Sequence, residues 1–427
     1  MNSIKKMKSV AGERFQYLVR DYNDVTVRFV LEYGVTADAE VLRTAVKTVL
    51  YSVDVLHGTL LEDKGKLTWQ IFEQIPEEQY FRHIRTEKNL RRAAAEQALI
   101  PVKPEEPVKM RCTLVENGRE SALVLCVSHT VADGGDARYL LKKIVEAYNR
   151  ILCTGSARGL AIKNGNRAPE QLYRHMSRQE QRKMWRNPLT GTKNQFPFQD
   201  QQPGTGRMIL ADIPREQMDR ARVRARQNGM TANDVILAAC YQAYAALPGV
   251  DPKAPVSITS MMDLRRHCPG GDSEGLSNMT GSLKTVMWDG VTGNYAQTLA
   301  EIGRQTREAK EDPLAGLAGV PMIHHAVGHA PLGLLLKIVP KVYRDMSVGV
   351  TNMGNLKGQD YMLGDAVPFR GLMGGPSKKK PGMQVSVLSV DGACTLCVVG
   401  EYTDSDEIQM KAMLENVVRV IRDYGEE

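Results

Sequence analysis

The sequence predicts an α/β protein made of two lobes, and three observations support this prediction. The chain has 427 residues, enough to bury a large core and to form two domains or lobes. Short apolar runs typical of strands alternate along it with longer stretches of helical periodicity. Between them, residues 166–205 are rich in Arg, Gln, Asn, Gly and Pro and poor in aliphatic side chains. We therefore expect an N-terminal lobe over 1–165, a basic crossover linker over 166–205 and a C-terminal lobe over 206–427.

Composition and charge narrow the class of protein. With 42% hydrophobic and 25% charged residues, the chain is typical of globular proteins. Its net charge of +7 is mild for this length and is no nucleic-acid signature, so we expect no nucleic-acid partner. The positive balance suits an anionic ligand or an acidic partner protein, and it suits a mildly basic solvated surface equally well.

Targeting and membrane signals are missing from the sequence. The N-terminal stretch MNSIKKMKSVAGERF is basic but has no apolar region of the kind that signal peptides carry. No run of about 18 apolar residues occurs, and Lys337 interrupts the longest one, residues 331–340. We therefore expect a cytoplasmic protein with no membrane span.

In the first half, the pattern predicts a strand–helix–hairpin opening followed by a second hairpin. An Asn-Gly turn at Asn117 and Gly118 is a strong signal for that second hairpin because it separates two apolar runs. The expected elements are a strand over 25–33, a helix over 39–53, a hairpin over 56–72, a short helix over 91–98, and strands over 108–115 and 122–127.

The stretch 121–141 carries the clearest functional signal. The expected strand 122–127 delivers Ser128 and His129 to its carboxyl end, and a helix with one apolar face follows Asp133, Gly134 and Gly135. A neutral imidazole is the side chain best suited to accept a proton near pH 7. An Asp four residues later can anchor the loop if a cation meets it, and the glycines permit a sharp turn or a positive φ. The structural alternative is a loop His beside an ordinary helix-capping Asp, but the strand before and the helix after favour the functional interpretation.

In the second half, strands and amphipathic helices alternate again. Thr231 and Asp234 form a variant of the capping box, and Asp391-Gly392 is the expected turn of a hairpin. The expected elements are strands over 207–213, 256–262, 347–351, 383–390 and 395–402, and helices over 179–185, 215–228, 235–246, 295–310, 321–343 and 405–424.

Two groups of residues are weak metal candidates. Cys394 and Cys397 form a C-x-x-C, but residues three apart in a strand point to opposite faces. The seven cysteines are scattered and odd in number, which argues against a disulfide framework. His325 and His329 have i, i+4 spacing, yet no acidic residue lies among them, so packed or partly exposed histidines are the preferred interpretation. We expect no metal.

The hexapeptide from His129 to Gly134 resembles the H-x-x-x-D-G signature of the chloramphenicol-acetyltransferase-like superfamily. This superfamily includes peptide-synthetase condensation domains, alcohol acyltransferases (alcohol acetyltransferases among them) and polyketide-associated acyltransferases. The resemblance implies two similar α/β lobes with an active-site tunnel between them. Condensation domains usually carry two adjacent histidines, whereas this chain has Ser128 at the first position, a departure that is more typical of single-histidine O-acyltransferases.

The same resemblance implies roles for further residues. Relatives have a D-x-R whose Arg pairs with the Asp of the motif, so Arg265 is the expected partner of a structural Asp133; a bidentate guanidinium also suits that task. Asn278, Asn352 and Ser128 are candidates for contacting substrate or the oxyanion, together with backbone amides near Gly134. Lys378, Lys379 and Lys380 either meet coenzyme A phosphates or form a solvated loop.

The expected function is that of an acyltransferase moving an acyl group from a thioester to a hydroxyl or amine acceptor. His129 would be the general base, with no covalent intermediate. We expect no permanently bound cofactor; acyl-coenzyme A is the favoured co-substrate because no carrier domain is recognised in the chain, and acyl-carrier phosphopantetheine is the other. The partners would be a small-molecule acceptor and, in the second case, an acyl carrier protein in trans. Two alternatives stay open: a carrier-dependent condensation enzyme forming an amide or ester, and a catalytically silent binding module.

Overall fold

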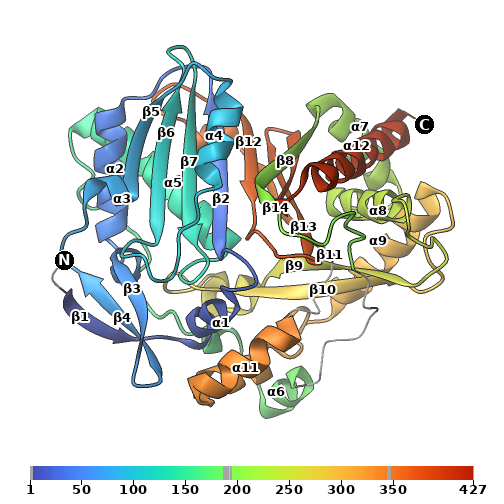
Figure 1. Cartoon of the computed structure of the whole chain (residues 1–427), viewed down its shortest axis with the longest axis horizontal. Coiled ribbons are helices and arrows are strands. Elements are labelled where there is room, and N and C mark those ends of the chain that lie inside the picture. Colours follow the sequence, from blue (N-terminus) through green and yellow to red (C-terminus); the bar gives the residue numbers. More distant parts are fainter. Residues whose placement is uncertain (1–2, 186–191, 193–194, 344–347, 427) are drawn as a thin grey trace.

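Two lobes lie side by side in the protein (Figure 1). A computed structural model describes residues 3–185, 192, 195–343 and 348–426. Each lobe contains a β-sheet covered by helices, which confirms the predicted α/β class and the arrangement of two similar lobes. Parts of the expected linker (residues 186–191 and 193–194) and Ser347, the first residue of an expected strand, lie outside the described residues.

The first lobe is built on a five-stranded sheet whose middle strand ends at the H-x-x-x-D-G motif. Helices α2 (Ala39–Tyr51) and α5 (Gly134–Thr154) cover one face, and α4 (Leu90–Ala98) covers the other. A strand covered on both faces shows a continuous apolar run rather than alternation, which explains the sequence of residues 122–127. The strands are, in spatial order, β12 (Pro368–Gly374), β2 (Thr26–Tyr33), β7 (Ser121–Ser128), β6 (Met110–Glu116) and β5 (Phe81–Arg85).

The second lobe is built on a six-stranded sheet. Its strands are, in spatial order, β10 (Thr280–Met287), β9 (Val256–Asp263), β11 (Val348–Leu356), β13 (Met383–Val390), β14 (Ala393–Tyr402) and β8 (Thr205–Ile213). One face forms a common apolar core with α7 (Arg215–Gln227), α8 (Ala232–Ala245), α9 (Tyr295–Glu311) and α12 (Asp404–Glu426). The opposite face meets the segment that follows β12, where Gly375 lies beside the side chain of Gln384.

Strand β12 connects the two lobes in a way that the sequence did not predict. It belongs to the region expected to form the second lobe, yet it pairs antiparallel with β2 at the edge of the first sheet. The sequence pattern predicted no strand over residues 368–374. A Cβ atom on Gly371 would lie 2.8 Å from side-chain carbons of both lobes, Leu31 and Val390, and one on Gly374 would lie 2.9 Å from Val399 of the second lobe. These glycines therefore permit a close approach while weakening the local strand signal.

The remaining elements surround the two lobes. The expected helix over 321–343 is in fact two helices, because Pro331 has no N–H to continue the first one. These elements are a small sheet of β1 (Ser3–Lys8), β4 (Lys66–Phe72) and β3 (Gly58–Asp63), the helices α1 (Ala11–Val19), α3 (Glu77–Tyr80), α6 (Arg178–Met184), α10 (Val320–His329) and α11 (Leu332–Tyr343), and single 3₁₀ turns at Asp54–His57, Pro169–Leu172, Arg265–His267, Pro269–Gly271 and Gly358–Tyr361.

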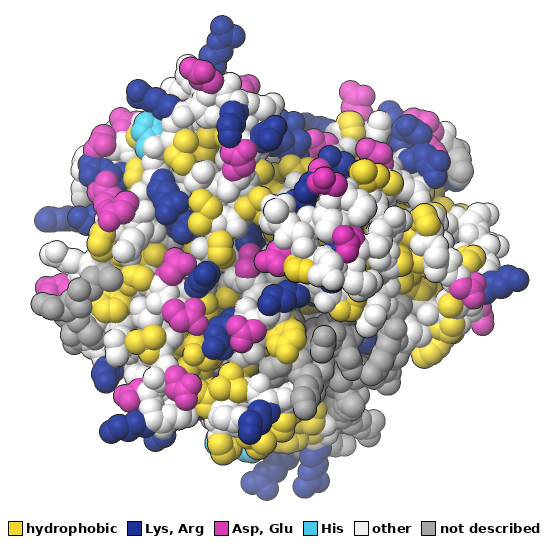
Figure 2. All heavy atoms as spheres, viewed as in Figure 1, with side chains coloured by type: hydrophobic (Ala, Val, Ile, Leu, Met, Phe, Trp, Pro, Cys, Tyr) yellow, Lys and Arg dark blue, Asp and Glu magenta, His cyan; other side chains and the backbone are white. Residues whose placement is uncertain are grey.

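Surface charge is mixed on the face shown in Figure 2, where Lys and Arg side chains are interspersed with Asp and Glu rather than gathered into one basic field. Among the residues that the structure describes, no helix has both the length and the apolar character that crossing a bilayer requires. The seven cysteines all belong to the described part, and none is paired in a disulfide.

Candidate active site

His129 lies immediately after β7 and is held by both lobes. Its backbone N–H donates to the carbonyl oxygen of Val25 at 2.6 Å, which continues the pairing of β7 with β2. Its ring Nδ1 lies 2.6 Å from Oδ1 of Asn278, which precedes β10 in the second lobe. The Nδ2 group of Asn278 donates to the backbone oxygen of His129 at 2.8 Å.

These two bonds assign the tautomer of the imidazole. Because Nδ2 of Asn278 must donate to a carbonyl oxygen, its Oδ1 is the atom that faces the ring and can only accept. The His129 Nδ1 therefore carries the proton, and Nε2 keeps its lone pair. A half-buried His in this state can accept a proton from a substrate through Nε2.

Burial also keeps the ring neutral. Desolvation lowers the pKa of His129 below its ordinary value of 6.5, and the opposing effects of the Asp133 charge and the Asn278 hydrogen bond are smaller. The imidazole is thus neutral at neutral pH, with a proton on Nδ1 and a free lone pair on Nε2, as a general base must be.

Asp133 is fully buried and turned away from His129 into an ion pair. Its carboxylate accepts from Nη1 and Nη2 of Arg265 at 3.0 and 2.9 Å. It also accepts from the backbone N–H groups of Asp136 and Met279 at 3.0 and 2.8 Å, the first of which makes it the N-cap of α5. Burial by itself would raise the pKa of Asp133, but Arg265 and the N–H donors outweigh it and hold this pKa below 3.8. The structure thus forms the pair expected from the sequence.

Arg265 meets a second buried carboxylate, which the sequence pattern did not single out for this role. Asp136 lies 2.9 Å from Arg265 Nη2 and 2.8 Å from Lys163 Nζ, and Lys163 also contacts Asp272 at 2.9 Å. Burial and the neighbouring Asp133 raise the pKa of Asp136. We call Asp133, Asp136, Lys163, Arg265 and Asp272 the Arg265 cluster; it ties the helix that follows the motif to the second lobe.

The glycines of the motif were expected to permit either a sharp turn or a positive φ. Neither Gly134 nor Gly135 adopts a positive φ, so the second possibility does not apply, and both glycines lie in the first turn of α5. A Cβ on Gly134 would lie 2.8 Å from Sδ of Met353, and a Cβ on Gly135 would lie 2.9 Å from Nη1 of Arg265. The glycines are needed for space, because the second lobe approaches the helix terminus at these two points.

Other predicted site residues lie elsewhere. Ser128 is fully buried and shares a 2.9 Å hydrogen bond with Thr130. Asn352 donates to Asn233 at 3.2 Å and accepts from Gly354 N–H at 2.9 Å, without contact to His129. Asn278, expected as an oxyanion donor, instead directs both ends of its amide at His129.

The three consecutive lysines have three different environments. Lys379 is exposed. Lys380 donates to the carbonyl oxygens of Asp200 and Gln202, each at 2.7 Å, and pairs with Asp406, so it is part of the fold. Lys378 is 9% exposed and faces the second-lobe sheet.

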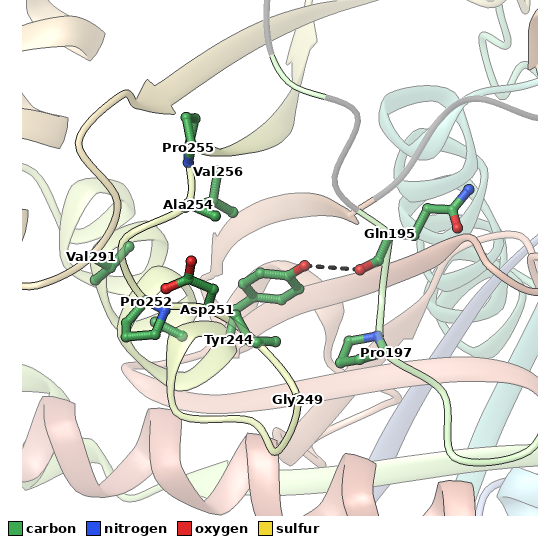
Figure 3. A pocket seen from close by; sticks show the side chains of 12 residues that line it. Gln195, Pro197, Tyr244, Gly249, Asp251, Pro252, Ala254, Pro255, Val256 and Val291 are labelled. Carbon is green, nitrogen blue, oxygen red and sulfur yellow. Dashed lines mark hydrogen bonds between the residues drawn. The ribbon is translucent and has the colours of Figure 1, made fainter.

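Two other features of the described residues, a pocket in the second lobe and a pair of stacked histidines, lie apart from the predicted site residues. A pocket of about 190 Å³ lies in the second lobe between Tyr244 and Asp251, where Tyr244 donates to the carbonyl oxygen of Gln195 (Figure 3); it contains none of the predicted site residues. In the part of the chain that the structure describes, no three His, Cys, Asp or Glu side chains converge as a metal ion would require. His325 and His329 stack with ring centroids 4.4 Å apart on α10.

Comparisons with known proteins agree with this architecture. A family model described as the condensation domain matches residues 15–308. The solved structure of the first condensation domain of the CDA synthetase has a TM-score of 0.71 and 14% identity over 99% of this chain and 97% of its own. The structure of polyketide synthase associated protein 5 from Mycobacterium tuberculosis has a TM-score of 0.68 and 15% sequence identity, over 98% of each chain. The structure of the trichothecene 15-O-acetyltransferase from Fusarium sporotrichioides has a TM-score of 0.70 and 10% sequence identity, over 97% of this chain and 95% of its own. No curated protein sequence matches the chain.

Proposed function

Because the chain belongs to the condensation-domain family, we propose that it transfers an acyl group from a thioester to a hydroxyl or amine, with His129 as the general base. The observation that carries this proposal is the pair of hydrogen bonds between Asn278 and His129, which orient the imidazole and place its proton on Nδ1, so that the Nε2 lone pair is available. As the acceptor attacks the thioester carbonyl, Nε2 takes its proton. The tetrahedral intermediate then expels the thiolate, which takes this proton back from Nε2 and leaves as the thiol, so His129 returns to its neutral state. Arg265 and Asp133 position the loop and do not touch the reacting atoms.

The likeness to an O-acetyltransferase and to a polyketide synthase associated protein supports a single-histidine acyltransferase. Ser128, where condensation domains usually have their first histidine, is buried against Thr130, so a single imidazole is presented here. We propose acyl-coenzyme A as the donor. The family itself favours one other candidate, a phosphopantetheinyl thioester on a carrier protein, with an amide or ester as product.

The test is thiol release from a panel of acyl-coenzyme A donors, with pooled alcohols and amines as acceptors. We expect release by the wild type to need an acceptor and to fall roughly 10²–10⁴-fold in His129→Ala. His175→Ala is the matched control, because His175 is exposed. Release that is equal in wild type and His129→Ala would contradict the mechanism. Release only from acyl groups loaded on a carrier protein would replace coenzyme A by the carrier, and no release from either donor would favour a binding module.

A further inference from the structure

Four residues form a row across the second-lobe sheet. Lys284 on β10 is paired with Thr259 on β9, Thr259 with Gly349 on β11, and Gly349 with Gln384 on β13. The side chains of directly paired residues project from the same face of a sheet, and the next residues along each strand project from the other face. Of these next residues, Ile258, Val350 and Val385 pack in the core beneath the helices. The row therefore lies on the opposite face, which meets the segment after β12.

Lys378 comes from that segment and completes the row. Its Nζ lies 3.7 Å from the position that a Cβ of Gly349 would occupy, and the Cγ of Gln384 lies at the same distance from this position. The glycine thus leaves the space into which the ammonium group extends. We call Lys284, Thr259, Gly349, Gln384 and Lys378 the cationic strip.

The polar side-chain groups of the cationic strip have no partners within the described part of the chain. Among the residues that the structure describes, neither ammonium group is in an ion pair, and neither these two groups nor the Thr259 hydroxyl or the Gln384 amide makes a hydrogen bond. Lys378 is nevertheless more than nine-tenths buried as a residue, so its ammonium group loses most of its hydration without gaining a protein partner, which is unfavourable; the group is not wholly shielded from solvent, which leaves it accessible to a ligand. The neighbouring Lys380 shows that this loop can satisfy a lysine, because there two carbonyls and Asp406 surround the ammonium.

The cationic strip is close to His129 through the backbone. The N–H of Asp24 donates to the Ser377 oxygen at 3.1 Å, and the N–H of Lys379 donates to the Tyr22 oxygen at 3.0 Å, so Lys378 lies beside Asn23. Residues 22–25 thus contact the Lys378 segment on one side. On the other side, the carbonyl oxygen of Val25 accepts a hydrogen bond from the backbone N–H of His129. Two strand spacings, roughly 10 Å, thus separate the backbones of Lys378 and His129.

We propose that the cationic strip binds an anionic group of a substrate, a carboxylate or a phosphate, while the reacting atom of that substrate lies at His129 Nε2. This assignment rests on the proposed acyl transfer. The two ammonium groups would supply charge, and the Thr259 hydroxyl and Gln384 amide would donate hydrogen bonds to the oxygens. A carboxylate would belong to the acyl group or the acceptor, whereas a phosphate would belong to the phosphopantetheine arm of the donor.

The protonation state of the lysines agrees with this role. Burial lowers the pKa of Lys378 to about 8 and also lowers the pKa of Lys284. Lys378 therefore remains mostly charged at pH 7, and a bound anion stabilises that charge.

Calorimetric titration with four probes tests the proposal: inorganic phosphate, succinate, coenzyme A, and pantetheine, which has the thiol arm without phosphate. We expect at least one anionic probe to bind and its Kd to rise about tenfold or more in Lys378→Met. Pantetheine affinity should be unchanged. The matched control is Lys379→Met, whose side chain is exposed and whose binding should equal that of the wild type. Gly349→Leu, which fills the space beside Nζ, should weaken the same probe.

The pattern among the probes identifies the source of the anion. Binding of succinate alone indicates a carboxylate substrate, and a loss of affinity for phosphate and coenzyme A together indicates the donor arm. The proposal is overturned if no anion binds the wild type up to millimolar concentration, or if Lys378→Met binds every probe as the wild type does. Repeating the titrations in His129→Ala separates the two proposals, because anion binding there is independent of acyl transfer.

Discussion

The Arg265 cluster and the cationic strip both place buried cations where the two lobes meet, but they differ in whether carboxylates neutralise these cations. Arg265 is surrounded by Asp133, Asp136 and Asp272. Lys378 is about as buried as Arg265, 9% against 7% exposed, and no carboxylate pairs with it in the described structure. A buried charge neutralised inside the protein serves the fold, whereas one left without a counter-charge is available to a ligand. Substitutions in the two clusters should therefore have opposite effects.

The largest effect is expected for Arg265→Met. This change leaves two buried carboxylates without their shared cation and should lower the free energy of unfolding by about 3–5 kcal/mol. The measurement is chemical denaturation at neutral pH. The deficit should shrink as the pH falls below 3.8, because the folded-state pKa of Asp133 lies below this value and its stabilising contribution is lost on protonation. Arg266→Met is the matched control because Arg266 is exposed; equal stability of the two variants would show that the cluster does not hold the lobes.

A smaller effect, on rate rather than on stability, is expected for Asn278→Ala. Loss of the bond to Nδ1 releases the ring from one tautomer, so kcat should fall about ten- to hundredfold with KM little changed. Exposed Asn228→Ala is the control.

A pH profile tests whether Asn278 acts on the imidazole itself. In the wild type, the acid limb of kcat/KM should lie below pH 6.5, because burial lowers the pKa of His129. Asn278→Asp places a negative charge against the ring, favours the imidazolium and should move that limb to higher pH. An unmoved limb would restrict Asn278 to a structural role.

The smallest effect, of opposite sign to that of Arg265→Met, is expected for Lys378→Met. Removing an unpaired buried ammonium should raise the free energy of unfolding by about 1–2 kcal/mol, measured by denaturation without ligand. Burial lowers the pKa of Lys378 from 10.5 to about 8 in the folded protein. The gain should therefore be fully present below about pH 8, where Lys378 of the wild type is charged in both the folded and the unfolded protein, and it should vanish above pH 10.5, where Lys378 is neutral in both. Lys379→Met should stay within about 0.5 kcal/mol of the wild type. A destabilised Lys378→Met would mean that Lys378 belongs to the fold.

Local patterns predicted the elements well where a single chain segment decides them. The apolar run ending at Ser128, the amphipathic α5 and the capping box at Thr231 depend on residues within one element. Prediction failed at β12 and at Pro331, where the conformation depends on pairing with a distant strand or on a single interrupting residue. Resemblance to a family added the pairing of Asp133 with Arg265, which are 132 residues apart.

By itself, then, the sequence determined the α/β lobes, the position of His129 at the end of a buried strand and its Asp four residues later, because these follow from local periodicity and a compact motif. Only the tertiary structure decided that Asn278 holds the imidazole, that the motif glycines make room for Met353 and Arg265, and that one of the three lysines, Lys378, is buried without a side-chain partner among the described residues. The physical reason is that each of these depends on which groups from the second lobe reach the first. A contact across lobes leaves no periodic trace in either of the segments that make it.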